Sequence, residues 1–500
     1  MKQLILPFIL FFSAKSFSQG YEIKINFKNA PDSIVYLAKY VLDKQYVVDT
    51  CKKVKNGTII FKGKASLDKG VYFLVSEGKA KYFDFFVNED SKFTITSDVM
   101  DMVNSFKCVG SKENELAFGY LKFMTNINRE FGKVAEKTKG MAKADSVKLV
   151  SEKTKSLHEE VVKFNADFRK TNEGSFFAAF LNLQTEKTAV DVPKSKNGRP
   201  DSIFYSNYYR AHFWDGVNFA DEKIYRTPFF SDRFKRYFDQ CVYMIPDTVI
   251  KELDKILIQC KTDVEVTKAF LAQITFDYET KSSKFVGFDK VFVHLIDRYI
   301  RAGWLKGYYT DETIEKIKDR GDILKPLLLG SVAPDLLMMD TINGKIANKM
   351  GFDSANTSAA VSHLYYKNLD KINTLYTTLH QLKAKYTILV FWDVECSHCL
   401  TEIPKLLQTW HELRKTYDIK VFSVYSQHEF DKWRKFIIEK KYDFINVFDA
   451  VHINNIKQKY DIFSTPKIYI LDKNKTIRSK GIAQEQIPEI IKMMEADDKK

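Results

Sequence analysis

The chain has 500 residues, of which 45% are hydrophobic and 14% aromatic. This is enough apolar material to build buried cores, which argues against an intrinsically disordered protein, and the length favours about three domains. The formal net charge is +14, but the lysines are spread along the chain among acidic residues. With no arginine-rich arm and no recognition motif, the charge argues against a nucleic-acid partner.

The first 18 residues have the pattern of a secretory signal peptide. Lys2 supplies the charged start, Leu4 to Phe12 form a short apolar core, and the small residues Ser16 and Ser18 precede the expected cleavage point. The apolar run is shorter than the ~20 residues that a bilayer-spanning helix needs. No cysteine lies near the cleavage point to carry a lipid. We therefore expect export to the periplasm or cell envelope, with no stable membrane insertion after signal cleavage.

Residues 21–112 are predicted to form an antiparallel β-sandwich. Apolar residues such as Tyr21, Ile23 and Ile25 alternate with polar ones, and turn residues such as Gly57 separate the runs. Several short strands at regular spacing are typical of a sandwich. Nothing in this region looks catalytic. The predicted strands are 21–27, 33–40, 45–51, 58–61, 71–75, 82–87 and 93–96.

Residues 113–330 are predicted to form an α-helical domain. The segment 145–170 places Val147 and other apolar residues at helical spacing, opposite a charged face. His294 lies in an apolar run without any motif partner, so we interpret it as a satisfied core histidine rather than a ligand. Residues 325–335 are interpreted as a linker into the last domain. Further helices are expected over 230–239, 246–259, 263–279 and 288–302.

Residues 331–500 alternate strands and helices in the order of a thioredoxin fold, which predicts a C-terminal α/β domain. The predicted strands are 387–392, 420–425, a short one at 447–448, and a hairpin of 467–471 and 477–481. The predicted helices are 396–417, 429–440, a piece ending at 460, and 485–494.

Four cysteines lie outside any motif, and they could form structural disulfides in an oxidising compartment, in any of three pairings. Pairing Cys51 with Cys108, and Cys241 with Cys260, would keep each bond inside one domain. Four buried free thiols are the alternative, because these domains are large enough to fold without disulfides.

Cys396 and Cys399, separated by two residues, stand where a predicted strand gives way to a helix. Such a pair can close a disulfide and reopen it, and the helix N-terminus stabilises the first sulfur as a thiolate, the attacking species in disulfide exchange. Pro404 follows eight residues after Cys396, where a kink in such a helix is common. Pro466, after Thr465, precedes a strand and is a candidate cis-proline, whose backbone would lie against the motif where a substrate chain can pair.

The last domain resembles the exported thiol-disulfide oxidoreductases of the TlpA/ResA type, which are thioredoxin-like. The β-rich start and the segment 285–295 also resemble domains of unknown function that accompany such modules in some Gram-negative bacteria. The oxidoreductase resemblance rests on Ala333-Pro334-Asp335, Phe391-Trp392, Cys396-x-x-Cys399-x-x-Glu402-x-Pro404, Trp433 and Thr465-Pro466.

The resemblance implies a role for each site residue. Cys396 would be the exposed nucleophile that forms a mixed disulfide, and Cys399 would resolve it. Glu402 holds the family's acidic position, where a carboxylate can tune thiol pKa values and relay protons; a helix-surface carboxylate is the alternative. Thr465 and Pro466 would form the substrate-facing loop. The implied partners are protein thiols and disulfides and a membrane or periplasmic redox partner, with no cofactor and no metal.

Two residues beside the cysteines depart from the family pattern. Glu395 stands where a Trp is usual, with Asp393 two residues earlier, and negative charge there raises the Cys396 pKa. His398, when protonated, would stabilise the thiolate and make the disulfide more oxidising, so it acts the opposite way. The sequence therefore leaves the direction of electron flow open, between reductase and oxidase or isomerase.

Three other functions compete with thiol-disulfide exchange. The chain could be an envelope binding or interaction protein in which the thioredoxin-like domain is accessory. Metal capture by Cys396, His398 and Cys399 is disfavoured because three ligands within four residues are too cramped for a tetrahedral site. A peroxidase would want Thr or Ser three residues before the attacking cysteine, where this chain has Asp393.

Overall fold

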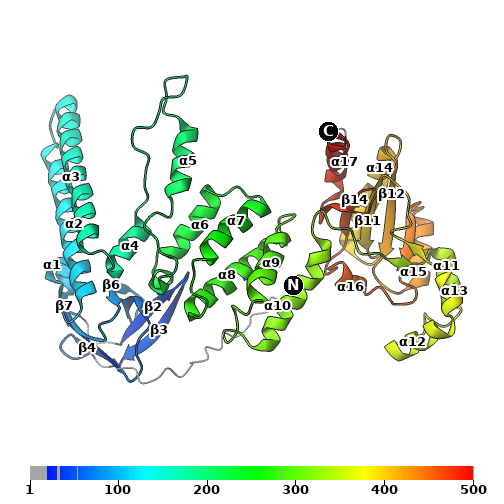
Figure 1. The fold of residues 1–500 in the computed structure, drawn as a ribbon, viewed down its shortest axis with the longest axis horizontal. Helices are drawn as coiled ribbons and strands as arrows, with labels where there is room; N and C mark the ends of the chain where they lie inside the picture. The colour runs from blue at the N-terminus through cyan, green and yellow to red at the C-terminus, as the bar shows by residue number, and fades with distance from the viewer. Residues whose placement is uncertain (1–19, 31–33, 53, 283, 499–500) are drawn as a thin grey trace. The chain divides into compact units, whose positions relative to one another are not determined.

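The computed structural model describes residues 20–30, 34–52, 54–282 and 284–498 (Figure 1). The chain divides into two units, Met1–Ala272 and Gln273–Lys500. The predicted signal peptide, residues 1–18, lies outside the described residues. Within the described part of the chain, no helix combines the length and apolar character needed to cross a membrane.

The first unit begins with two four-stranded sheets, in the strand orders β4-β1-β7-β8 and β3-β2-β5-β6. The strands are β1 Tyr21–Lys28, β2 Val35–Val41, β3 Lys44–Cys51, β4 Thr58–Gly63, β5 Gly70–Ser76, β6 Lys81–Val87, β7 Lys92–Asp98 and β8 Lys107–Val109, with short helices η1 Val99–Asp101 and α1 Met102–Ser105 before β8. Inward residues of both sheets, among them Ile25, Leu37 and Phe85, share one core. The predicted β-sandwich is confirmed, with one departure: β1 pairs with β7 in parallel, Ile25 opposite Ile95. An alternating pattern gives the buried face of a strand but not its direction.

Helices cover the outer face of the second sheet. The helices of this unit are α2 Lys112–Lys137, α3 Lys143–Thr171, α4 Phe176–Gln184, α5 Ser202–His212, η2 Glu222–Arg226, α6 Phe230–Gln240, α7 Pro246–Leu257 and α8 Glu265–Ser282, the last of which runs into the second unit. Phe86 of β6 packs edge-on against Phe176, Phe177 and Phe180 of α4, with ring centroids 5.0 to 5.2 Å apart. The carboxylate of the buried Glu113 in α2 accepts the backbone N–H groups of Phe176 and Phe177, each at 2.9 Å. The predicted helical region is confirmed, and it is joined to the sandwich through this aromatic layer.

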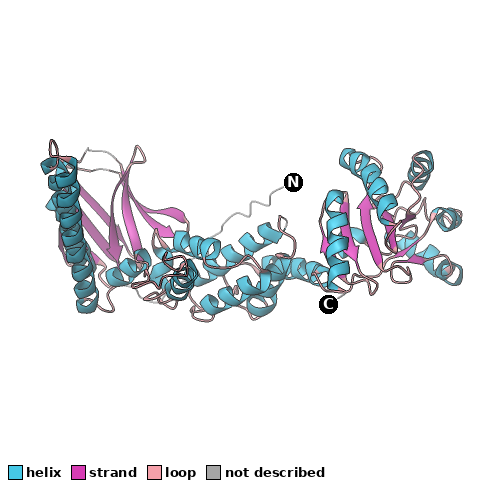
Figure 2. Cartoon of the chain, turned by 90° about the horizontal axis from the view of Figure 1, so that it is seen from above, coloured by secondary structure: helices cyan, strands magenta, loops and turns pink. Residues whose placement is uncertain are grey.

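The second unit contains a five-stranded sheet in the order β13-β12-β11-β14-β15. Its strands are β11 Tyr386–Trp392, β12 Ile419–Tyr425, β13 Ile445–Phe448, β14 Lys467–Leu471 and β15 Ile477–Lys480. The pairs β11–β12 and β12–β13 are parallel, whereas β14 runs antiparallel to both β11 and β15. Every residue of β11 is buried, because helices cover both faces of the sheet (Figure 2). The predicted C-terminal α/β fold is confirmed.

Besides α10 Asp311–Leu324, three helices of this unit were not predicted from the sequence: α11 Thr341–Asn348, α12 Ser358–Lys367 and α13 Leu369–Asn373, between the short paired strands β9 Leu337–Met338 and β10 Thr377–Thr378. The others are α9 Asp289–Leu295, the π-helical turn η3 Ile296–Ile300, η4 Lys325–Leu327, α14 Ser397–Leu413, α15 Phe430–Glu439, α16 Ile456–Lys459, η5 Gln484–Gln486 and α17 Ile487–Asp497.

The segment interpreted as a linker is held against the sheet. The backbone N–H of Gly330 donates to Ile477 O at 2.9 Å, and the N–H of Ile477 donates to Ser331 O at 2.8 Å, so residues 330–332 lie beside the start of β15. At the opposite edge, Met339 and Phe448 exchange two backbone hydrogen bonds of 3.0 Å. An edge strand carries unpaired N–H and C=O groups, and here the β15 edge pairs with the linker and the β13 edge with Met339, which follows the linker.

Candidate active site

Cys396 lies at the N-terminus of α14, at the carboxyl end of the buried strand β11. It is the N-cap residue, with φ −75° and ψ 113°, and its Sγ accepts the backbone N–H of Cys399 at 3.3 Å. The Cys396 N–H itself donates to Asp393 O at 3.4 Å, which closes the turn from strand to helix. The first N–H groups of a helix lack intrahelical partners, so they are available to a negatively charged sulfur.

The pKa of the Cys396 thiol lies below its ordinary value. Partial burial raises this pKa, but hydrogen bonds from the Cys399 and Thr465 side chains and from the backbone N–H groups of Cys399 and His398 outweigh that effect. Hydrogen bonds to a thiolate favour the charged form. Cys396 is also half-buried rather than enclosed, so a partner sulfur can reach it.

Cys399 has the opposite environment. It is fully buried, and burial, followed by the hydrogen bond with Cys396, raises the pKa of its thiol to about 12. At neutral pH the Cys399 sulfur therefore keeps its proton, and the Cys396 sulfur is the more acidic of the two. This asymmetry distinguishes an attacking sulfur from a resolving one.

The loop that contains Thr465 and Pro466 contacts Cys396 through Thr465. The peptide bond between them is cis, and the Cys396 thiol donates to Thr465 O at 3.3 Å. The sheet explains this proximity, because Lys467, the first residue of β14, pairs with Phe391 near the end of β11. The structure thus brings together four of the six predicted site residues: Cys396, Cys399, Thr465 and Pro466.

The two other predicted site residues lie on α14 beside this group. His398 is exposed in the first turn of the helix. Glu402 Oε1 accepts from Lys405 Nζ at 2.8 Å, and its side chain is 14% exposed. Among the described hydrogen bonds and ion pairs, Glu402 is joined to Lys405 and to neither cysteine. Pro404 lies inside α14, as predicted.

The sequence did not reveal the partners of the two acidic residues before Cys396. Lys432 Nζ of α15 donates to the Glu395 carboxylate, and Gln427 Nε2 donates to Asp393 Oδ2 at 2.9 Å. Both partners follow β12, which is the neighbour of β11 in the sheet. The strand order brings Lys432 and Gln427 to the two acidic residues, and no local spacing in the sequence indicates this proximity.

Three further cysteines and His294 lie in other parts of the chain. Neither within-domain disulfide considered from the sequence is present in the described residues, since Cys108, Cys241 and Cys260 are thiols. Burial raises the pKa of the Cys108 thiol to about 12 and those of Cys241 and Cys260 to about 11, so these sulfurs are protonated at neutral pH. His294 is half-buried, with its ring 6.4 Å from that of Tyr299. The described residues contain no group of three or more His, Cys, Asp or Glu side chains suited to a metal ion.

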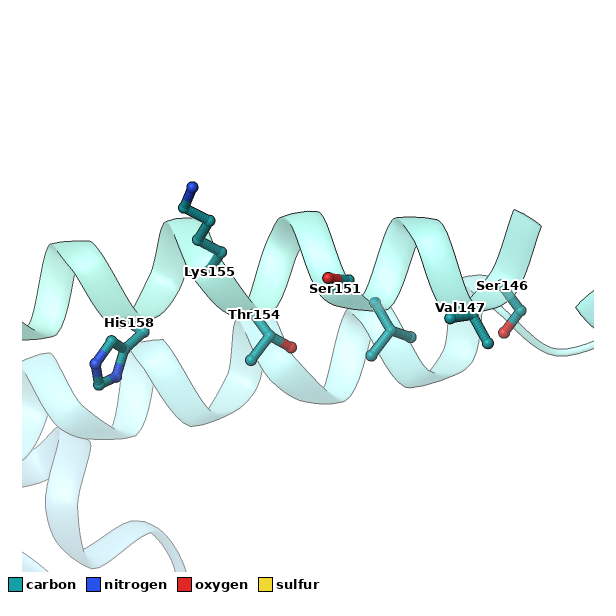
Figure 3. A pocket seen from close by; sticks show the side chains of 7 residues that line it. Ser146, Val147, Ser151, Thr154, Lys155 and His158 are labelled. Atoms are coloured by element: carbon teal, nitrogen blue, oxygen red, sulfur yellow. The ribbon is translucent and has the colours of Figure 1, made fainter. Parts of the chain in front are cut away.

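A shallow groove on α3 is not a second candidate site. Seven side chains line it, all from α3, and they project from this single helix (Figure 3). One helix face offers no opposing wall to enclose a ligand. The lining residues are Ser146, Val147, Val150, Ser151, Thr154, Lys155 and His158.

Comparison with known proteins agrees with this geometry. Residues 367–480, which contain both motif cysteines and the Thr465–Pro466 loop, match the AhpC/TSA family. The C-terminal part of the chain belongs to this thioredoxin-like family. Residues 21–117 and 145–320 match two domains of unknown function, DUF4369 and DUF5106. No curated protein matches the chain.

Several solved structures are similar to parts of the chain. A domain of a "possible thiol-disulfide isomerase" from Cytophaga hutchinsonii is 34% identical, with a TM-score of 0.27; the match covers 35% of this chain and 97% of that one. A thioredoxin-like protein from Bacteroides caccae is 18% identical over 62% of this chain and 99% of its own, with a TM-score of 0.35. A thiol:disulfide interchange protein from Bacteroides sp. is 21% identical over 33% and 88%, with a TM-score of 0.24.

Proposed function

We propose that the protein is an exported thiol-disulfide oxidoreductase that exchanges a Cys396–Cys399 disulfide or dithiol with cysteines of other proteins. The observation that carries the proposal is the contrast between the two sulfurs: Cys396 is accessible with a lowered pKa, and Cys399 is buried with a pKa raised to about 12. A pair arranged in this way attacks with one sulfur and completes the exchange with the other.

In the reducing direction the Cys396 thiolate attacks a sulfur of the substrate disulfide. A Cys396–substrate bond forms, the substrate S–S bond breaks, and the released substrate thiolate takes up a proton. Cys399 then loses its proton and attacks Cys396 Sγ, which releases the second substrate sulfur as a thiol. The substrate gains two electrons and two protons, and the Cys396–Cys399 pair becomes a disulfide. The oxidising direction is the same sequence reversed.

The loop at Thr465 and Pro466 is the proposed docking place for the substrate backbone. Its position against Cys396 supports this role, because an extended chain that pairs with the loop presents its own cysteine to the Cys396 sulfur. We assign Glu402 to proton transfer or tuning on the resemblance alone, and its ion pair with Lys405 is the alternative role. The exchange needs no cofactor, because the sulfurs carry the electrons.

The location and partners follow from the same proposal. The signal-peptide pattern of residues 1–18 supports export to the periplasm or cell envelope, where protein thiols and disulfides are the substrates. A membrane or periplasmic redox partner would return the pair to its starting state. The equilibrium potential against glutathione decides the direction: about −120 mV indicates an oxidant and about −270 mV a reductase.

A disulfide-exchange assay on purified wild-type protein and on the Cys396→Ser variant tests the proposal. The wild-type protein should exchange disulfides with a disulfide-bonded peptide in at least one direction, and the Cys396→Ser variant should be inactive. Cys108→Ser is the control, because it removes a thiol whose burial raises its pKa and should leave the rate unchanged. Reduced and oxidised wild-type protein that are equally inert toward thiols and disulfides would refute the proposal.

A further inference from the structure

The loop that brings Thr465 to Cys396 is tied at its start to helix α10. Both carboxylate oxygens of Asp461 accept from the guanidinium of Arg320: Nη1 contacts Oδ1, and Nη2 lies 3.2 Å from Oδ2. The side chains are only 27% and 12% exposed. A bidentate pair with this degree of burial is directional and is weakly screened by salt.

Asp461 also binds the far end of the same loop. Lys467 Nζ donates to the backbone O of Asp461 at 2.6 Å and lies 3.4 Å from its Oδ2. Lys467 directly follows Pro466 and opens β14, so Asp461 closes residues 461–467 into a ring of contacts. Thr465 O, the atom that meets Cys396, lies inside this ring.

Arg320 is itself fixed on two sides. Its Nε lies 3.5 Å from Glu279 Oε1 in α8, and its guanidinium carbon is 5.6 Å from the ring centre of Phe463. The Phe463 side chain is 80% exposed, so the ring is open to a partner chain beside Thr465. Arg320 therefore contacts the start of the loop and its most exposed apolar side chain at once.

We propose that Arg320 is a positioning residue for thiol-disulfide exchange, which holds the Thr465–Pro466 loop against Cys396 in the geometry that receives a substrate chain. This inference rests on the proposed function. It assigns an indirect part in the chemistry to α10, a helix that carries none of the predicted site residues.

Arg320→Met tests the inference, with Lys316→Met as the matched control. Lys316 lies on the same helix, and its ion pair among the described residues is with the exposed Glu312, 2.6 Å away. For Arg320→Met we expect kcat/KM for a disulfide-bonded peptide to fall roughly tenfold, since a small displacement of positioning groups costs this much or more. Oxidised glutathione, which is too small to pair along the loop, should react within about twofold of wild type. Arg320→Lys keeps the charge but not the bidentate contact, so it should be intermediate.

A second readout does not depend on turnover. Iodoacetamide alkylation of reduced protein, followed at Cys396 by mass spectrometry, should have a different pH dependence in Arg320→Met than in Lys316→Met, because the hydrogen bond between the Cys396 thiol and Thr465 O is disturbed. If wild-type protein alkylates normally but exchanges nothing, the proposed function fails, and the alkylation comparison alone decides the role of Arg320.

Two results would overturn the inference. In the first, Arg320→Met matches Lys316→Met in both kcat/KM and alkylation. In the second, Arg320→Met reduces kcat/KM equally for the peptide and for glutathione, without any change in the pH dependence of alkylation. If Arg320→Met does not fold, Asp461→Asn replaces it. Asn has the same size and tolerates the left-handed backbone at this position, φ 55°. It should show the same split between peptide and glutathione.

Discussion

The Glu395 carboxylate, adjacent to Cys396 in the chain, is paired with Lys432 from helix α15. Glu395 alone would oppose a thiolate at Cys396, since like charges disfavour each other. Lys432 offsets the charge of Glu395, whereas Asp393 accepts from the neutral amide of Gln427. The hydrogen bonds at the N-terminus of α14 then lower the pKa of Cys396. The ion pair thus removes one of the two electrostatic objections that the sequence raised.

Lys432→Met should make Cys396 less reactive. The unpaired Glu395 would raise the Cys396 pKa, and we expect alkylation at pH 7 to slow roughly threefold at low salt, with a smaller effect at high salt. Lys435→Met is the control, because Lys435 is on the same helix and pairs with Glu439. The double variant Lys432→Met/Glu395→Gln should recover the wild-type rate. A Lys432→Met protein with wild-type alkylation at low salt would show that the pair does not matter to Cys396.

Cys399→Ser should trap the first half of the exchange. The Cys396 thiolate can still attack a substrate disulfide, but no sulfur remains to release it, so the mixed disulfide accumulates. Mass spectrometry should find the substrate bonded to Cys396. Cys396→Ser should give no adduct, because burial keeps Cys399 protonated and inaccessible. An adduct on Cys399 would reverse the assigned roles.

The stability of the reduced protein should depend on the Cys396 thiolate. Folding lowers the pKa of the Cys396 thiol below its value in the unfolded chain, about 8.5. The thiolate therefore contributes its full stabilisation at pH values above about 8.5, and this contribution is lost as the pH falls through the pKa of the folded protein. In urea unfolding of reduced protein, wild type should gain stability over Cys396→Ser as pH rises from 5 to about 8.5. A difference that is constant with pH would mean that the fold does not favour the thiolate.

Glu113→Ala should destabilise the first unit. It would leave two backbone N–H groups at the start of α4 without their carboxylate partner, a loss of about 1–3 kcal/mol. Glu115→Ala is the matched control, an exposed acid two residues further along α2. A lower thermal midpoint for Glu113→Ala alone, with unchanged Cys396 alkylation, is expected. Equal midpoints for both variants would contradict the capping role.

Local patterns were enough to predict the elements around the site but not their long-range partners. The run 386–392 was recognisable as a strand because it is continuously apolar, and Pro466 was recognisable because it precedes another strand. The Glu395–Lys432 and Arg320–Asp461 pairs join residues 37 and 141 positions apart. Such contacts depend on the order in which strands and helices pack, which neither periodicity nor spacing encodes.

The same limit applies to the rest of the fold. The alternation in β1 predicted its buried face, but the parallel pairing with β7 depends on how the chain crosses between the sheets. Helix α12 has no fully buried residue, so it lacks the clear apolar stripe that marks an amphipathic helix. Helix α12 was missed for this reason.

The partial cover of the two sheet edges has a consequence for the oxidoreductase proposed above. An enzyme of this kind that acts on unfolded chains would meet many unpaired backbone groups, and an open sheet edge can pair with them without regard to their cysteines. The chain itself pairs with Ile477, the first residue of β15, through Gly330 and Ser331, and with Phe448 of β13 through Met339. Less of each edge is then open to a foreign backbone, which favours pairing at the Thr465 loop beside Cys396.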